Sequence, residues 1–235
     1  MRRRDKDGAV FVTKVEFDGF ANTFADVAGQ NTSFFNSDHS YFGRYRSNIV
    51  RKFAGSSVEK VLDFGCGVGL GIGPLREVFP NSRIVGCDPS QDSLTLARMR
   101  EPDCEFLESD EIQPIPQFDI IIAVCVFHHI RPSDRDTAVR YCYERLKAGG
   151  RFFVFEHNPF NPVTRHLVSR CPVDKDAILM TRKETVTRLK QAGFNLVANE
   201  YFLIFPNALA FLRRLERSLG WLPLGGQYFV AGARP

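Results

Sequence analysis

The sequence lacks several patterns that mark common classes of protein. None of its six cysteines belongs to a C-x-x-C pair, so no zinc site is predicted and no metal cofactor is expected. No apolar run approaches the roughly 20 residues that cross a bilayer, and no apolar stretch follows the N-terminal arginines as it would in a signal peptide. We therefore expect a cytoplasmic protein without a transmembrane segment, whose thiols stay free in a reducing compartment.

A strong excess of one charge is also lacking, because 31 Lys and Arg accompany 27 Asp and Glu. The one basic cluster, Arg2 to Arg4, is interpreted as a solvated tail, with an arm for nucleic acid as the alternative. The length of 235 residues suits a single α/β domain. We divide it into an N-terminal helical cap (1–57), a ligand-binding core (58–156), and a substrate-side loop with a C-terminal sheet edge (157–235).

Strand and helix patterns alternate along the core. The predicted strands span 58–63, 83–87, 104–107, 118–126 and 151–155, and the predicted helices span 70–79, 90–100 and 132–146. The fourth strand is an almost continuous apolar run, as expected of a central parallel strand that is buried on both faces. This alternation predicts a doubly wound α/β fold with a mostly parallel sheet.

The two flanks of the core differ from it. Two helices rich in aromatic residues are predicted within 14–54, separated near 29–38. After the core we expect a proline-broken loop, a helix from the capping box Thr181-x-x-Glu184 to about Gly193, a strand over 195–204, an amphipathic helix over 206–219 and a strand over 227–231. The amphipathic helix is expected to pack on the sheet, and contact with a membrane surface or a partner is the alternative.

A carboxylate and three alternating glycines follow the first predicted strand. Asp63 ends this strand, and Gly65, Gly67 and Gly69 complete the pattern D-x-G-x-G-x-G. Glycines let the backbone turn tightly and approach a ligand closely. Because ligands of open α/β sheets bind at the carboxyl ends of the strands, this loop is the predicted cofactor site.

The spacing of these glycines does not fit a dinucleotide site. The pattern G-x-G-x-x-G fails in every frame, because Leu70, Ile72 and Pro74 stand where its last glycine is needed. The carboxylate of Asp63 also suits a cationic group, such as an ammonium, better than a phosphate. S-adenosylmethionine (SAM) carries an ammonium and a sulfonium, so SAM is favoured and an NAD-dependent oxidoreductase is the alternative.

Two further acids follow the next strands in order. Asp88 ends the second strand, where a carboxylate can accept hydrogen bonds from ribose hydroxyls. Asp110 follows the third strand, where a carboxylate can accept a hydrogen bond from an adenine amino group. Either acid alone would more often be a turn or cap residue. The succession of Asp63, Asp88 and Asp110 at three strand ends favours a nucleoside ligand.

On these residues the sequence resembles the class I SAM-dependent methyltransferases, over about residues 58–156. The segment from Leu62 to Gly69 is similar to the glycine-rich motif of the family, and Leu146-Lys147-Ala148-Gly149-Gly150 is similar to its L-K-P-G-G turn. The resemblance implies a Rossmann-like, seven-stranded sheet whose last strand is antiparallel, with SAM bound and S-adenosylhomocysteine as product. The cofactor-binding residues taken from it are Asp63, Gly65, Cys66, Gly67, Gly69, Asp88, Pro89, Ser90, Asp110, Glu111 and Val126.

Three histidines follow the fourth and fifth strands, at the mouth where an acceptor should arrive. His128 and His129 follow the fourth strand, and His157 follows the fifth. A hydroxyl that accepts a methyl group usually needs a general base, and histidine suits that role near neutral pH. We expect one of the three to act as base or to contact the acceptor. The alternative is that they are loop residues bonded to nearby backbone.

The same stretch argues against a nucleic-acid substrate. Enzymes that methylate the exocyclic amines of bases resemble one another in an (Asp/Asn/Ser)-Pro-Pro-aromatic turn, whereas this chain has Ala123-Val124-Cys125-Val126-Phe127-His128 there. The segment from Glu156 to Ala177 resembles one in bacterial methyltransferases associated with glycan or natural-product pathways. We therefore expect methylation of a small-molecule hydroxyl. Methylation of an amine, or SAM binding without catalysis, is the alternative.

Overall fold

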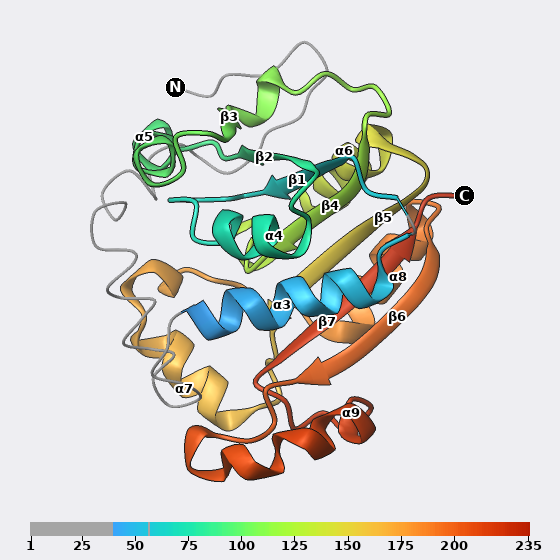
Figure 1. Cartoon of the computed structure of the whole chain (residues 1–235). Coiled ribbons are helices and arrows are strands. Elements are labelled where there is room, and N and C mark those ends of the chain that lie inside the picture. The colour runs from blue at the N-terminus through green and yellow to red at the C-terminus, as the bar shows by residue number, and fades with distance from the viewer. Residues whose placement is uncertain (1–39, 56) are drawn as a thin grey trace.

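The computed structural model describes residues 40–235 except residue 56, and its centre is a seven-stranded sheet with the order β3-β2-β1-β4-β5-β7-β6 (Figure 1). The strands are β1 Lys60–Phe64, β2 Arg83–Cys87, β3 Glu105–Leu107, β4 Phe118–Val124, β5 Leu146–His157, β6 Asn195–Phe202 and β7 Gln227–Ala233. Neighbouring strands among β1 to β5 pair in parallel, and β7 pairs antiparallel with both β5 and β6. The predicted Rossmann-like sheet with an antiparallel last strand is therefore confirmed.

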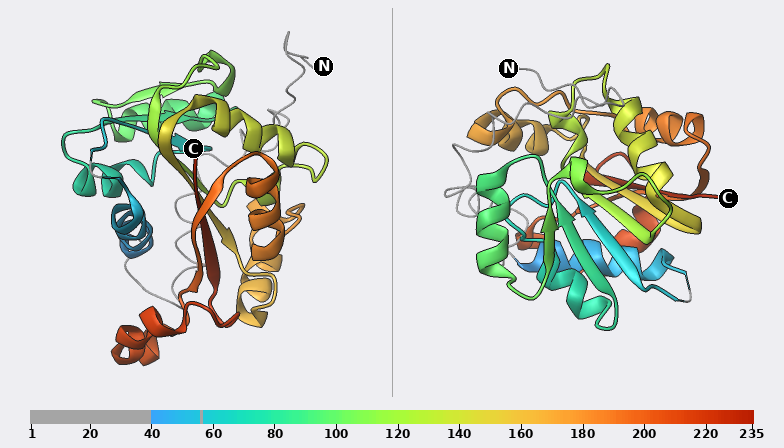
Figure 2. Two further views of the ribbon diagram at one scale, coloured as in Figure 1. Left: turned by 90° about the vertical axis from the view of Figure 1, so that its right-hand side faces the viewer. Right: turned by 90° about the horizontal axis from the view of Figure 1, so that it is seen from above.

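Helices cover both faces of this sheet (Figure 2). One face carries α3 Ser40–Phe53, α4 Ile72–Val78 and α5 Gln91–Arg100, and the other carries α6 Arg135–Arg145 and α8 Arg182–Gln191. α7 Pro162–Arg170 follows β5, and α9 Glu216–Leu219 lies beyond the ends of β6 and β7 (Figure 1). Because the strand ends are not covered by these helices, the loops at the carboxyl ends of β1, β2, β4 and β5 can meet at one edge.

Alternation along the central strands separates two hydrophobic clusters. Ile121 and Ala123 of β4 pack with α6 and α8 in one cluster, while Ile120 and Ile122 pack with α3, α4 and α5 in the other. Since successive side chains of a strand point to opposite faces, a continuous apolar run is what a doubly covered strand needs. The prediction from 118–126 is thus confirmed, although β4 ends at Val124.

Two predictions C-terminal to the core need correction. A proline-broken loop is predicted after Glu156, with a short helix that carries Arg165, His166 and Arg170 as the alternative. The alternative is correct, because Pro162–Arg170 forms α7, whose N-cap Asn161 accepts a hydrogen bond from the Thr164 amide at 2.9 Å. The helix predicted over 206–219 is instead a 3-10 helix, η4 Asn207–Leu215, followed by α9. No residue of η4 is buried, so it does not pack on the sheet. Leu209 has non-helical backbone angles inside this segment, which interrupts a regular α-helix there.

The remaining predicted elements differ from the observed ones mainly in their ends. The fifth strand was expected to begin after Gly149-Gly150, but β5 already begins at Leu146 and its pairing with β4 shifts between Phe118 and Ile120. The second predicted N-terminal helix is α3, whereas the first lies outside the described residues, as do Arg2 to Arg4. Within the described part of the chain, no helix has the length and apolarity to cross a membrane.

Candidate functional site

The loop after β1 needs its three glycines for conformational reasons. Gly65, Gly67 and Gly69 have φ angles of 75°, 50° and 79°, in the left-handed region that other residues adopt at a cost. The amides of Gly65 and Cys66 both donate to the carbonyl oxygen of Cys87, at 2.8 and 3.0 Å, which fixes the loop against the end of β2. The backbone angles of this turn therefore favour glycine at all three positions of the sequence pattern.

The three glycines face different surroundings. A Cβ atom on Gly65 would lie 2.5 Å from Cγ2 of Val126, and one on Gly69 would lie 3.2 Å from Cβ of Ala97. A Cβ atom on Gly67 would meet no atom within 4 Å. Gly65 and Gly69 are thus required by packing within the chain, whereas Gly67 presents bare backbone to open space where a ligand can approach.

Asp63 lies beneath this loop at the end of β1, with only 5% of its surface exposed. Burial raises the pKa of its carboxyl to about 7, the charge of Asp88 adds to the rise, and Arg46 opposes it. A buried carboxyl with this pKa gains most from a cationic partner, because the partner replaces the lost hydration of the charged form. The site therefore suits the ammonium group predicted from the sequence.

Asp88 connects the loop to the start of α5. Its Oδ2 accepts a hydrogen bond from the Gly67 amide at 2.9 Å, and its Oδ1 accepts one from the Ser90 amide at 2.9 Å. Each carboxylate oxygen has two acceptor positions, so contact with ribose hydroxyls stays possible. Asp88 accordingly orders the glycine loop besides standing at the position predicted for the ribose.

The other residues predicted to bind the cofactor fall into two groups. Cys66 and Ser90 are buried: the Cys66 side chain joins the core beneath the loop, and the Ser90 hydroxyl caps α5 by accepting from the Ser93 amide at 3.2 Å. Pro89 is half-buried between Asp88 and this cap. Asp110 and Glu111 are exposed on the 3-10 helix η1 Ser109–Glu111, and the Glu111 carboxylate accepts from the Glu108 amide at 2.6 Å. Cys66 can therefore offer a ligand only its backbone.

The three predicted histidines come together in one cluster beside the loop. His128 and His129 belong to the 3-10 helix η2 Phe127–His129 after β4, and His157 ends β5. The ring centroid of His128 lies 4.1 Å from that of His129 and 5.2 Å from that of His157. Two segments from neighbouring strands thus place three imidazoles at one edge of the sheet, and His157 is only partly buried there.

Two carboxylates bind this cluster, and sequence reasoning assigned a role to neither. His128 Nδ1 lies 2.6 Å from Oε2 of the fully buried Glu156, whose Oε1 accepts from the Phe127 amide at 2.7 Å. Asp174, at the end of the 3-10 helix η3 Pro172–Asp174, places its Oδ1 3.5 Å from His128 Nε2 and 3.3 Å from His129 Nε2. Only the unusual composition of the segment from Glu156 to Ala177 pointed to this region.

These carboxylates decide the electrostatics of the cluster. Burial lowers the pKa of His128, but the charges of Glu156 and Asp174 outweigh burial and raise it well above the ordinary value. Burial and the neighbouring His128 lower the pKa of His157 to about 4. Burial raises the pKa of Asp174, yet the facing imidazoles of His128 and His129 bring it below the usual range. The cluster is therefore a coupled set of opposite charges.

Arg46 of α3 is a further site residue that the sequence pattern did not reveal. Its Nε and Nη2 donate to Oε1 of Gln227 at 3.2 and 2.9 Å, and Nε2 of Gln227 lies 3.6 Å from Sγ of Cys125. Cys125 has a φ of 56°, a strained angle for a residue with a side chain. Burial lowers the pKa of Arg46, while the charges of Cys125, Glu156 and Asp63 raise it. A cation from the N-terminal helix therefore stands between the Asp63 loop and the histidine cluster.

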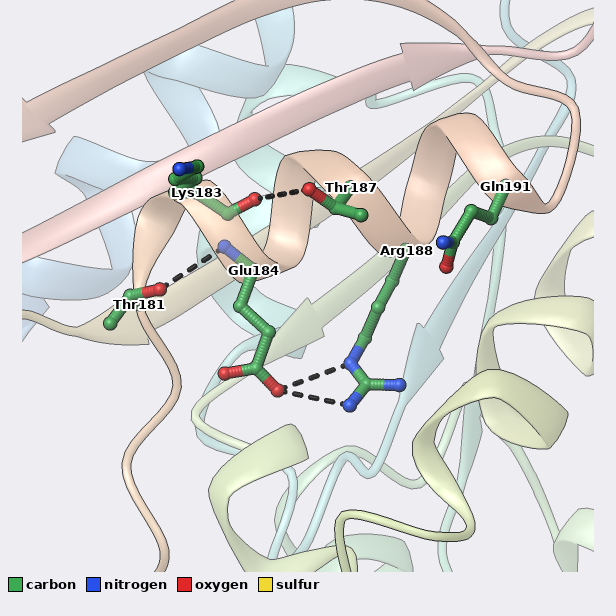
Figure 3. Close-up of a pocket in the computed structure, with 6 residues that line it drawn as sticks. All are labelled: Thr181, Lys183, Glu184, Thr187, Arg188 and Gln191. Carbon is green, nitrogen blue, oxygen red and sulfur yellow. Dashed lines mark hydrogen bonds and ion pairs between the residues drawn. The ribbon is translucent and has the colours of Figure 1, made fainter.

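A separate surface depression lies on α8, away from every predicted site residue (Figure 3). It is lined by Thr181, Lys183, Glu184, Thr187, Arg188 and Gln191. The Thr181 hydroxyl caps the helix by accepting from the Glu184 amide at 3.1 Å, and Glu184 pairs with Arg188 at 3.0 Å. Glu184 also pairs with Arg135 and Arg188 with Asp136, both of α6, so the polar groups of this depression are accounted for by contacts within α8 and between α8 and α6.

Comparisons with known proteins agree with this geometry. Residues 62–152 match the family described as a methyltransferase domain. An uncharacterized methyltransferase of Bacillus mycoides is 27% identical over 198 residues, which cover 81% of this chain and 82% of the relative. Trans-aconitate 2-methyltransferase of Escherichia coli is 41% identical over 69 residues, and this match spans 28% of this chain and 27% of that enzyme.

A solved structure shows the same fold across almost the whole chain. The SAM-dependent methyltransferase of Thermotoga maritima described as a possible histamine N-methyltransferase superposes with a TM-score of 0.64 at 18% identity, covering 94% of this chain and 99% of that one. The family match covers the glycine loop and the segment of His128 and His129 but ends before His157, and the fold matches on both sides of it. Residues 62–152 therefore carry a methyltransferase domain, within a chain that has the fold of SAM-dependent methyltransferases.

Proposed function

We propose that this enzyme transfers the methyl group of SAM to a hydroxyl group of a small molecule. The observation that carries the proposal is the adjacency of two sites, the glycine loop at buried Asp63 and the histidine cluster with partly buried His157. Val126, which directly precedes the cluster, packs on Gly65, and Arg46 acts on the charges of both sites. Methyl transfer is a direct displacement, so its main requirement is to hold a nucleophile in line with the methyl carbon. An acceptor held at His157 would approach a cofactor held at the loop.

The cofactor half of the proposal assigns a group of SAM to each part of the loop. The ammonium pairs with Asp63, whose buried carboxyl lacks the hydration that stabilises its charge. The chain of the cofactor crosses Gly67, where no protein atom fills the space of a side chain. Asp88 accepts hydrogen bonds from the ribose, and exposed Asp110 or Glu111 lies toward the adenine.

The acceptor half assigns His157 to the hydroxyl. His128 is 1% exposed and held between Glu156 and Asp174, which leaves it unsuited to direct contact with a substrate. His157 is more accessible and adjoins this pair, so its imidazole can accept a hydrogen bond from the hydroxyl and take up its proton during transfer. The names of the similar proteins include trans-aconitate and histamine, so they do not select the acceptor atom. An amine acceptor is therefore the second candidate.

The chemical class of the acceptor is proposed from the C-terminal part of the site. The segment from Glu156 to Ala177, which resembles one found near glycan or natural-product pathways, supplies Asp174 to the histidine cluster. Asn158 fixes the start of this segment, because its Nδ2 donates to the carbonyl oxygens of Pro223 and Gly225 at 2.9 and 2.7 Å. We propose a hydroxylated glycan or natural-product precursor as acceptor.

Calorimetric titration with SAM, S-adenosylhomocysteine and NAD tests the cofactor site. We expect both sulfur ligands to bind at micromolar levels and NAD not to bind. Asp88→Ala should weaken SAM binding by roughly 1–3 kcal/mol, because the ribose hydroxyls and the Gly67 and Ser90 amides lose their acceptor. Tight binding of NAD without SAM, or an Asp88→Ala variant of unchanged affinity, would contradict the assignment.

Transfer of tritiated methyl groups from SAM to panels of hydroxylated and aminated small molecules tests the acceptor. We expect labelled products among the hydroxyl compounds. His157→Gln should then lower kcat/KM by roughly 10²–10⁴-fold without changing SAM affinity, whereas the exposed His166→Gln should leave both unchanged. Labelling confined to amines would replace the hydroxyl proposal with its alternative.

A further inference from the structure

The histidine cluster contains a donor set that the methyl-transfer proposal does not use. Nε2 of His128 and Nε2 of His129 both face Oδ1 of Asp174, at 3.5 and 3.3 Å. These three residues offer two imidazole nitrogens and one carboxylate oxygen that all lie within 4.8 Å of one another. Both distances exceed the usual length of a nitrogen–oxygen hydrogen bond. Both contacts are therefore too long to be good hydrogen bonds, and they share the Oδ1 atom of Asp174.

The spacing of the donors fits a metal ion better than it fits direct bonding. Ligand atoms that lie about 2.0–2.2 Å from a tetrahedral zinc ion are separated from each other by about 3.4 Å. The two nitrogen–oxygen distances, 3.5 and 3.3 Å, agree with this separation, and the distance between the two nitrogens is at most 4.8 Å. A cation can therefore lie among the three atoms with little movement of the side chains.

A buried nitrogen without a partner points into the same place. The His128 side chain is 1% exposed, and its Nε2 has no hydrogen-bond partner within the part of the chain that the structure describes. Burying a polar atom without a partner is unfavourable, and such atoms in folded proteins often indicate an ion or water that completes the site. The other nitrogen of this ring, Nδ1, is held by Glu156 at 2.6 Å.

The contact between Glu156 and His128 has the form of the outer support found at metal sites. Metal-binding histidines usually donate their second ring nitrogen to a carboxylate, which fixes the tautomer and the direction of the ring. With Nδ1 held by Glu156, Nε2 is the ring nitrogen that faces Asp174, and it can bind an ion once the ion displaces its proton. Glu156 is in turn held by the Phe127 amide, so the support is rigid.

Backbone contacts bring the donors together from distant parts of the sequence. The amide of Ile178 donates to the carbonyl oxygen of His128 at 2.9 Å, which attaches the segment carrying Asp174 to η2. The buried Arg135 reinforces this joint, because its guanidinium donates to the carbonyl oxygens of Phe127, Ile130 and Ile178. The donors are thus preorganised, and no spacing motif in the sequence could have shown them.

We propose that His128, His129 and Asp174 bind a divalent transition-metal ion of the zinc type. Two imidazole nitrogens favour such an ion over magnesium or calcium, which prefer sites made of oxygen atoms. His129 and Asp174 are each 14% exposed, which gives the ion access from solvent. Three protein ligands leave a coordination position open, and an ion bound there could polarise an oxygen of the acceptor. This inference differs from the expectation of a metal-free protein drawn from the cysteine pattern.

Calorimetric titration of the untagged, chelator-treated protein with zinc chloride tests the site, with magnesium chloride in parallel. We expect one zinc ion per chain and no saturable binding of magnesium. Cobalt chloride should give the visible absorption bands of a tetrahedral cobalt ion. The readouts need neither SAM nor an acceptor, so their outcome is separate from that of the methyl-transfer proposal.

Matched variants locate the ion. Asp174→Asn and His129→Gln should each weaken zinc binding at least tenfold, whereas Asp176→Asn and His166→Gln, which alter exposed residues outside the cluster, should leave it unchanged. Thermal unfolding of the metal-free variants confirms that they fold. Absence of stoichiometric zinc binding to the folded protein, or binding that survives both cluster substitutions, would overturn the proposal.

Discussion

At the scale of single residues, Asp63 shows how burial serves binding at a cost in stability. A surface aspartate is ionised at neutral pH, but burial raises the pKa of this one to about 7, against the opposing charge of Arg46. A cationic ligand can compensate for the hydration that the ionised carboxylate loses on burial. Perturbed groups of this kind are concentrated at functional sites. Asp63 is therefore the residue whose titration should be visible in cofactor binding.

The affinity for S-adenosylhomocysteine should rise with pH through the titration of Asp63. The free protein binds a proton at this carboxyl below about pH 7, and that proton must leave before the ammonium can pair with the carboxylate. Between pH 6.0 and 7.5 the expected gain in affinity is about eightfold. Calorimetry at both pH values measures it, and Asp63→Asn, which cannot titrate, should bind weakly with little pH dependence. A wild-type affinity that stays constant over this range would disprove the assignment.

The same shift predicts that Asp63→Asn stabilises the free protein at neutral pH. The unfolded chain ionises Asp63 near pH 4, whereas the folded chain resists ionisation until about pH 7, so wild-type stability falls as pH rises between these values. The Asp63→Asn variant has no carboxyl to ionise, so its stability does not fall for this reason. The gain in the free energy of unfolding should therefore be small at pH 4 and approach at most about 4 kcal/mol above pH 7. Urea unfolding at pH 4 and pH 8 measures the difference, and a gain that is equal at both would argue against it.

At the scale of elements, the loop between β1 and α4 contains one glycine that folding requires, Gly65, and one that ligand binding is expected to require, Gly67. Gly65→Ala would place its Cβ 2.5 Å from Val126, so this variant should lose both stability and cofactor affinity. Gly67→Ala meets no atom within 4 Å, so it should lose only about 1–2 kcal/mol of stability through its positive φ angle. Its methyl group would occupy the ligand's space, which predicts a loss of affinity at least tenfold greater than the unfolding data explain. Thermal unfolding and calorimetry of the pair decide this, and a Gly67→Ala variant of normal affinity would remove the loop from the site.

Elements were predictable from sequence where local pattern and long-range packing agree. The apolar run of β4 needs cover on both faces and has it, and the glycines predicted to allow a tight turn have the positive φ angles of one. The segment 206–219 has the alternation of an amphipathic helix, but in the described part of the chain no residue of η4 is buried. Periodicity predicts which face of a segment is apolar, but it does not predict which residues pack against that face.

The acceptor side was predictable only in part, because its groups meet through tertiary structure. His128, His129 and His157 could be selected, since each follows a strand of the sheet. Asp174 reaches them through the backbone contact between Ile178 and His128, and Arg46 arrives on a helix that precedes the core. No spacing rule connects residues so distant along the chain. Their discovery required the folded structure.

At the scale of the whole molecule, the proposed cofactor site joins segments that follow three different strands of the sheet. The loop after β1 is bonded to the end of β2, Asp88 joins the loop to α5, and Val126 after β4 packs on Gly65. A ligand that contacts all of these groups binds only when the sheet edge is intact. Binding and global unfolding should therefore be linked through the whole domain.

S-adenosylhomocysteine should consequently raise the unfolding temperature of the entire protein in a single transition. At a concentration one hundred times its Kd, a ligand specific for the folded state adds about 2.7 kcal/mol, which corresponds to about 5–11 °C for a domain of this size. Adenosine shares the ribose and adenine but lacks the ammonium that Asp63 is proposed to bind, so at the same concentration its shift should be much smaller. Differential scanning calorimetry compares the two ligands. Equal shifts from both would show that the amino-acid end of the cofactor gains nothing from the buried carboxyl, and the central role given to Asp63 would then be wrong.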